Sequence, residues 1–239
     1  MLTGLASRLA SALGQHGHAD DGRPAGLAET AAAEVTVLGQ RTRILELLAW
    51  VRADPAALAA CAALSYRHPL GFDNLGLIDA GPLFTLRLHL WRPGGSRSVE
   101  HVHNHRFGFA SMLLRGSYEM RIFRPGQTGM PMTEYREGLA SRAAGWRLDQ
   151  VGEAHVRQLA VLTLHQGSSY WIGPQVLHRI AVPPAALCCT LFLETARVAP
   201  TTRVFTTPGL AVPAAVPRRT FSPDDYARGI DAVIAELSR

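Results

Sequence analysis

The stretch that decides the fold is His101-Val-His-Asn-His-Arg-Phe-Gly-Phe-Ala-Ser-Met-Leu-Leu-Arg-Gly116. His101, His103 and His105 alternate along it, and side chains two residues apart share one face of a strand. Three imidazoles on one face are costly to bury unless each has a partner, and a metal ion is a common partner for them. The apolar run 107–114 follows, and Gly116 lies eleven residues after His105. The stretch therefore predicts strands that carry metal ligands.

A second block contains a distant histidine partner: Gly167-Ser-Ser-Tyr-Trp-Ile-Gly173-Pro-Gln-Val-Leu-His178. Its first glycine, its turn and its terminal histidine stand six and then five residues apart. The Gly-Pro turn separates two short runs that are typical of strands. We therefore expect His178 to begin a strand.

Outward from these blocks, short strands alternate with turns rich in Gly and Pro. So many strands without helices between them predict an antiparallel sandwich or barrel. The expected strands are Leu83–Trp91, Glu100–Arg115, Ser117–Phe123, Trp146–Val151, Val156–Leu164, Ser168–Trp171, His178–Val182 and Leu187–Ala196.

Helices are predicted on both sides of this β-rich region. Residues 1–40 form an N-terminal helix and a flexible linker over Gly14–Gly26, and residues 41–200 hold two helices, 41–51 and 54–64, and the barrel. Residues 201–239 are a Pro-rich connection and a last helix, in which Ser222 is the N-cap and Pro223 the first residue. The expected organisation is thus one barrel with helical additions at each end.

Composition sets the class of protein. Hydrophobic residues make up 47% and charged residues 18%, which is typical of a soluble globular chain. The net charge of +5 is carried by Arg alone, since the chain contains no Lys, and because the Arg residues are scattered singly we expect no nucleic-acid partner. No apolar run approaches the roughly 20 residues of a membrane helix, and no secretory signal is recognised. Three cysteines without framework spacing favour a reducing cytoplasm.

Together the two blocks resemble the two cupin motifs, over about residues 83–195. The resemblance implies a mainly β, double-stranded β-helix (jelly-roll) barrel and a metal held by His103, His105 and His178. The chain departs from the motifs at the glutamate ligand, where it has Phe109, and at the first glycine, where it has Arg97. The missing glutamate leaves a three-histidine site, similar to the cysteine dioxygenase family, which uses iron(II) and dioxygen to oxidise a thiol.

The likeness does not extend to the thiol-specific residues of that family. Its catalytic Ser, His and Tyr fall on Thr190, Phe192 and Glu194, of which only Thr190 is chemically close. Its carboxylate-binding arginine falls near Leu75, and none is there. The resemblance therefore implies the fold and the metal site, and leaves the substrate open.

Two strands supply further candidates for the site. Along Leu83–Trp91, Arg87, His89 and Trp91 share a face, which lies either in solvent or inside the barrel. If it lies inside, Arg87 is the candidate for binding an anionic group, and His89 and Trp91 line the pocket.

Phe109 and Phe192 are expected to add apolar walls to that pocket. Glu194 is either a general base or orienting residue or a surface carboxylate at a strand end. A register in which His101 and His103 form the ligand pair is the alternative to His103 and His105.

The leading hypothesis is an iron(II) oxygenase that acts, with dioxygen, on a small thiol-bearing or anionic molecule in the cytoplasm. Neutral imidazoles also suit zinc, nickel and other divalent metals. Cupin isomerases or epimerases that use zinc, nickel or manganese, and non-enzymatic small-molecule-binding cupins, are therefore the alternatives. Cupins often dimerise, so a homodimer is left open.

Overall fold

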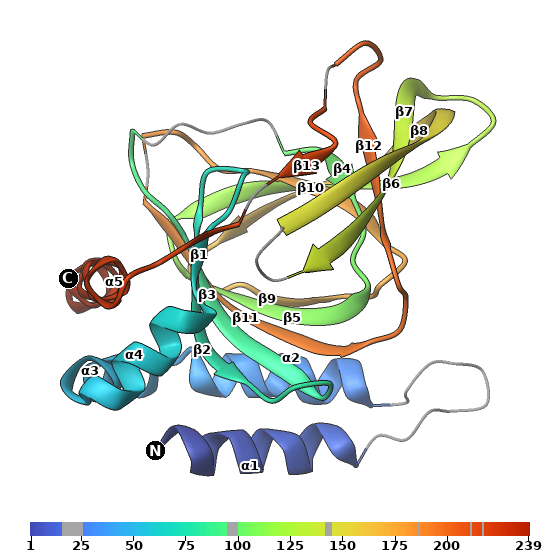
Figure 1. The fold of residues 1–239 in the computed structure, drawn as a ribbon. Coiled ribbons are helices and arrows are strands. Elements are labelled where there is room, and N and C mark those ends of the chain that lie inside the picture. The colour runs from blue at the N-terminus through green and yellow to red at the C-terminus, as the bar shows by residue number, and fades with distance from the viewer. Residues whose placement is uncertain (16–25, 95–99, 142–144, 186, 211, 217) are drawn as a thin grey trace.

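Two antiparallel β-sheets face each other and form the walls of a barrel in the computed structural model (Figure 1), which describes residues 1–15, 26–94, 100–141, 145–185, 187–210, 212–216 and 218–239. In order across the first sheet the described strands are β14 (Arg219–Thr220), β1 (Tyr66–Arg67), β2 (Asp73–Asp79), β3 (Phe84–Trp91), β11 (Cys188–Arg197), β5 (Phe107–Arg115) and β9 (Ser169–Ile172). Across the second they are β13 (Ala215–Val216), β8 (Gly145–His165), β6 (Ser117–Gly126), β10 (Leu177–Ala181), β4 (Val102–His103), β12 (Thr202–Thr206) and β7 (Met130–Ser141). The jelly-roll fold class predicted from the two motifs is confirmed.

Helices cover the outer face of the first sheet (Figure 1). They are α1 (Leu2–Gly14), α2 (Leu27–Leu38), α3 (Arg41–Ala53), α4 (Pro55–Leu64) and α5 (Pro223–Ser238). Side chains of α4 and α5 pack with those of β2, and α2 packs against β5 and β9. In the part of the chain described here no one helix has the length and apolar character to cross a membrane, whereas α3 and α4, bent by 104° at their junction, meet those two criteria together.

This helical layer decides which face of β3 points inward. Leu86, Leu88 and Leu90 are fully buried in the core that the helices share with the first sheet. Since side chains alternate across a strand, Arg87 and His89 then point to the opposite face, into the barrel. The alternative in which this polar face meets solvent is therefore wrong.

The predicted helix starts are confirmed. The carboxylate of Asp54 accepts hydrogen bonds from the backbone N–H groups of Ala56 and Ala57 at the start of α4. Ser222 and Asp225 form a capping box at the start of α5, which satisfies N–H groups that the helix itself leaves without acceptors.

The single strand expected over Glu100–Arg115 is wrong, because the chain changes sheets there. Val102–His103 (β4) belongs to the second sheet and Phe107–Arg115 (β5) to the first. Asn104 fixes the corner: its side-chain oxygen accepts from the N–H of Arg203 at 2.6 Å, and its side-chain nitrogen donates to the carbonyl of Pro174 at 3.0 Å. These side-chain bonds replace the ladder of a continuous strand.

The two strands expected at Trp146–Val151 and Val156–Leu164 are one strand, β8. Its first part pairs with β7 and its second part with β6. Among the described residues, seven further elements were not predicted: α2, β1, β2, β7, β12, β13 and β14. Strand β2 is buried on both faces up to Ile78, so it lacks the alternation that marks a half-buried strand. The linker expected over Gly14–Gly26 lies mostly outside the described residues.

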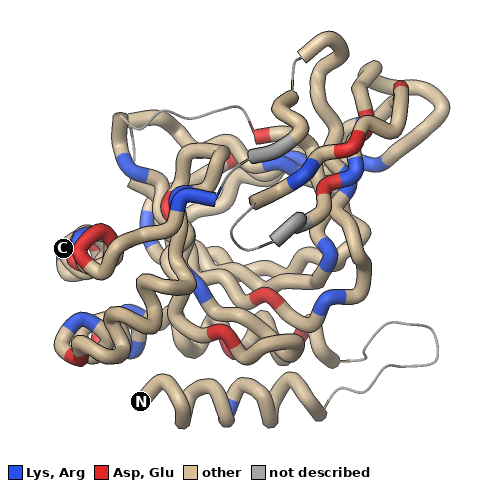
Figure 2. Tube along the Cα trace, in the orientation of Figure 1, with Lys and Arg blue, Asp and Glu red and all other residues tan. Residues whose placement is uncertain are grey.

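Opposite charges are interspersed over the surface. Figure 2 shows positive and negative positions next to one another on the arm formed by β7 and β8 and on α5. Arg147 lies 2.9 Å from Asp149 on β8, and Arg228 pairs with Asp225 on α5. On these elements, positive charge is therefore balanced locally by carboxylates.

Candidate metal centre

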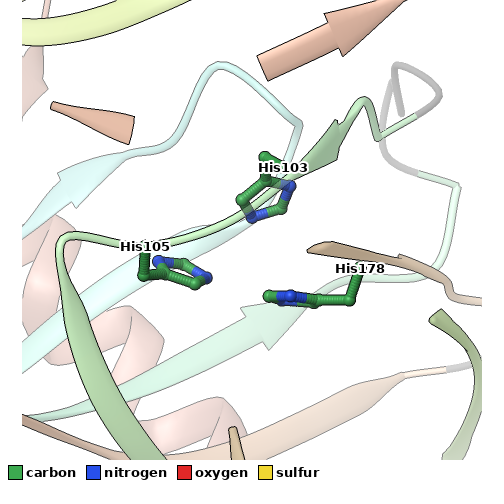
Figure 3. Close-up of side chains that lie close together, drawn as sticks. All are labelled: His103, His105 and His178. Atoms are coloured by element: carbon green, nitrogen blue, oxygen red, sulfur yellow. The ribbon is translucent and has the colours of Figure 1, made fainter. Parts of the chain in front are cut away.

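Three histidine side chains converge on the inner face of the second sheet (Figure 3). His103 of β4 and His178 of β10 are direct cross-strand partners, and His105 follows His103 by two residues, at the corner where the chain changes sheets. One ring nitrogen from each of the three lies within 4.8 Å of the others. A separation above about 8 Å would have put His178 beyond the reach of a shared ion, so the geometry agrees with a single centre.

Backbone carbonyls orient two of these rings. The Nδ1 atom of His103 lies 2.9 Å from the carbonyl oxygen of His101, and that of His178 lies 3.2 Å from the carbonyl oxygen of Val176. A carbonyl only accepts, so each Nδ1 carries the proton and each Nε2 keeps its lone pair. Of the described residues, His103, His105 and His178 make up the group, and His101 contributes its carbonyl to it.

Burial keeps the rings of His105 and His178 neutral. Burial first, and the nearby His103 second, lower the pKa of His178 to about 3. Burial also lowers the pKa of His105 well below its usual value, with smaller effects from His103 and His178. Neutral imidazole is the form that binds a metal. The donor set therefore fits a divalent ion such as iron, zinc, copper or nickel.

The histidines form part of the wall of a cavity of about 920 Å³ between the two sheets. Most of the remaining wall near them is aromatic. Phe109 stacks on Phe192 with ring centroids 4.4 Å apart and lies 4.9 Å from the ring of His105. His89 lies 4.6 Å from Phe192, and Trp91 lies 5.8 Å from His89. The five pocket residues proposed from the sequence, Arg87, His89, Trp91, Phe109 and Phe192, all lie along this wall.

Arg87 and Glu194 form an ion pair inside the barrel. The Oε2 atom of Glu194 accepts from the Arg87 guanidinium and from the hydroxyl of Thr85, the latter at 3.2 Å, while Arg197 lies 3.5 Å from Oε1. Only 4% of the Glu194 side chain is exposed, so the reading of it as a surface carboxylate is wrong. The anion-binding role expected for Arg87 and the general-base role expected for Glu194 compete, because each side chain neutralises the charge of the other.

Several cavity residues were not identified from the sequence. Glu100 lines the cavity, accepts a hydrogen bond from the N–H of Ile180, and has a pKa raised by burial. His68 stacks on Phe72 with centroids 4.3 Å apart, and burial lowers its pKa to about 3. Glu100 falls on a position of the first motif that the motif does not specify, and His68 lies in a loop, which the alternation that marks strand residues does not reach.

The chain was compared with known proteins. No family model matches it, and no curated protein does. Among solved structures it is similar to an RmlC-like cupin from Shewanella frigidimarina, at 15% identity and a TM-score of 0.34 over 55% of this chain and 82% of that one. An RmlC-like cupin from Ralstonia eutropha matches at 11% identity and 0.34 over 72% and 80%, and a hydroquinone 1,2-dioxygenase from Sphingomonas sp. at 10% and 0.31 over 49% and 62%. Likenesses this distant say nothing of the chemistry, which has to be inferred from the residues of the site.

Proposed function

We propose that this chain is an iron(II)-dependent oxygenase of small molecules, with His103, His105 and His178 as the metal ligands. The observation that carries the proposal is the convergence of three imidazoles, two of them held by backbone carbonyls, on the wall of a large interior cavity. Structural zinc sites usually fill all four positions, often with Cys. Three protein donors leave positions for dioxygen and a substrate.

The charges of the site suggest an acidic substrate group. No carboxylate stands among the three convergent donors, so a divalent ion there would keep its full charge, which a thiolate or carboxylate of the substrate would balance. When bound, iron(II) would supply the redox chemistry between dioxygen and the substrate. Phe109, Phe192 and Trp91 would hold an apolar part of the molecule, and Arg87 would take a second anionic group only by exchanging Glu194 for it.

Metal analysis combined with oxygen uptake tests the proposal. The purified protein is expected to hold iron at close to one ion per chain and to consume dioxygen with a small acid or thiol from a panel of both. His178→Ala is expected to lose both properties. His165→Ala, which changes an exposed histidine at the end of β8, is the matched control and should keep them.

Other results of the same measurements would favour one of the alternative functions. Zinc, nickel or manganese without oxygen uptake would favour the isomerase or epimerase alternative. A protein that binds no divalent metal would overturn the proposal and favour a non-enzymatic binding role.

A further inference from the structure

Four hydroxyl groups gather on the cavity wall. Tyr118 of β6 and Tyr170 of β9 have their phenolic oxygens 2.6 Å apart. Ser111 of β5 is the direct cross-strand partner of Tyr170, and Thr190 of β11 is a diagonal neighbour of Ser111 on the same face of the sheet. All four line the same cavity as the histidines. We call them the hydroxyl cluster.

The hydroxyl cluster has protons that no described residue accepts. Two phenols share one hydrogen bond, so one of their two O–H groups is not used in it. The hydroxyl oxygen of Thr190 is buried without a hydrogen-bond partner among the described residues, and its side chain is only 2% exposed. Ser111 is close enough to Tyr170 to lower the pKa of that phenol. Buried hydroxyls left without partners cost free energy, so native proteins rarely keep them without a reason.

The surroundings of the cluster favour a neutral ligand atom. Burial is the largest of the causes that raise the pKa of Tyr170 to about 12 and that of Tyr118 well above its usual value. Both phenols are therefore neutral donors. The guanidinium of Arg87, which lies inside the barrel, is engaged by Glu194.

An aromatic wall connects the cluster to the histidines. The ring of Phe109 lies 6.1 Å from Tyr170 and 5.7 Å from His178, and Trp91 lies 6.4 Å from Tyr118. A molecule placed along this wall would meet imidazoles at one end and hydroxyls at the other. Flat aromatic or cyclic molecules fit such walls because they make ring contacts along their whole length.

We propose that the hydroxyl cluster binds a neutral oxygen acceptor, such as a carbonyl oxygen, at the end of an aromatic or cyclic substrate whose acidic end lies at the three histidines. The placement of the acidic end rests on the proposed function, and the recognition of the neutral oxygen does not. Tyr170 and Thr190 are the donors that select this oxygen.

A pair of isosteric probes tests the recognition. The probes are 4-acetylbenzoate and 4-isopropenylbenzoate, which differ in a C=O against a C=CH₂ group, and their affinities are measured by calorimetry on metal-free and on anaerobic iron-loaded protein. The wild-type protein is expected to bind the acetyl probe about threefold to tenfold tighter, as one or two hydrogen bonds predict. Tyr170→Phe and Thr190→Val should each reduce this ratio and leave the affinity for the isopropenyl probe unchanged.

Two control variants, and the comparison of metal-free with iron-loaded protein, make the test decisive. Tyr135→Phe and Thr163→Val change a tyrosine and a threonine that do not line the cavity, and the ratio should stay as in the wild type. A wild-type ratio near one, a ratio that survives in the Tyr170→Phe/Thr190→Val double variant, or binding of neither probe at millimolar concentration would overturn the proposal. If iron loading does not increase the affinity for either probe while the ratio of the two affinities persists, the proposed metal function is wrong and the proposed role of the hydroxyl cluster is supported.

Discussion

The ion pair between Arg87 and Glu194 allows a quantitative test of the barrel interior. Their side chains are 18% and 4% exposed, so both charges lie largely out of water. Removing one partner of a buried pair usually costs about 3–5 kcal/mol, because the other charge is left without compensation. In Glu194→Leu the Arg87 guanidinium keeps the hydroxyl of Thr85. We therefore expect a loss near the lower end, about 3 kcal/mol.

Arg87→Leu and the double variant separate the energy of the ion pair from the cost of removing one partner alone. Arg87→Leu should cost a similar amount, because Glu194 would keep only Thr85 and the exposed Arg197. The double variant, with two leucines, should lie within about 1 kcal/mol of the wild type, since apolar replacement of a buried pair is often neutral.

Urea unfolding at pH 7 measures these differences, with unchanged m-values showing that each variant keeps its compactness. The exposed pair Arg147 and Asp149, with 66% and 57% of the side chains accessible, is the control and should couple by less than about 1 kcal/mol. A loss below about 1 kcal/mol in Glu194→Leu, or a double variant as unstable as the sum of the single ones, would refute the closed interior pair.

Three further predictions follow from the same geometry. His105→Ala should abolish metal binding in calorimetric titrations whereas His101→Ala should only weaken it, and the reverse order would shift the ligand register. Gly116→Ala should lower stability by about 2 kcal/mol or more, because Gly116 has φ +88° and an added Cβ would lie 2.5 Å from the carbonyl oxygen of Leu187; an unchanged melting temperature would contradict this. The pKa of His68 is lowered from 6.5 to about 3, so its contribution to stability is complete above pH 6.5 and is lost as the pH falls toward 3, by up to about 1.4 kcal/mol per pH unit. His68→Phe should therefore flatten the dependence of the urea midpoint on pH between 7 and 4 in metal-free protein, and an equally steep dependence would count against the lowered pKa.

Local patterns predicted an antiparallel sandwich or barrel, and the resemblance of two sequence motifs to a known family added the jelly-roll fold and the set of three histidines. The alternation of His103 and His105 needs only the two-residue period of an extended chain, which survives even though the strand breaks at Asn104. The spacing from Gly167 to His178 describes one turn between short strands, so it too is local information. The caps at Asp54 and Ser222 were predictable because a helix start is decided within four residues.

The pairing of residues far apart in the chain required the tertiary structure. Arg87 and Glu194 are separated by 107 positions, and the sequence patterns give no sign that one would neutralise the other. The hydroxyl cluster draws one residue from each of four strands, and the parity that tells inside from outside is lost at each turn between them. The corner at Asn104 was missed for a related reason, since its hydrogen-bond partners Pro174 and Arg203 come from distant segments. Alternation and spacing determine which residues share a face of one strand, whereas only the packing of the two sheets decides which faces meet.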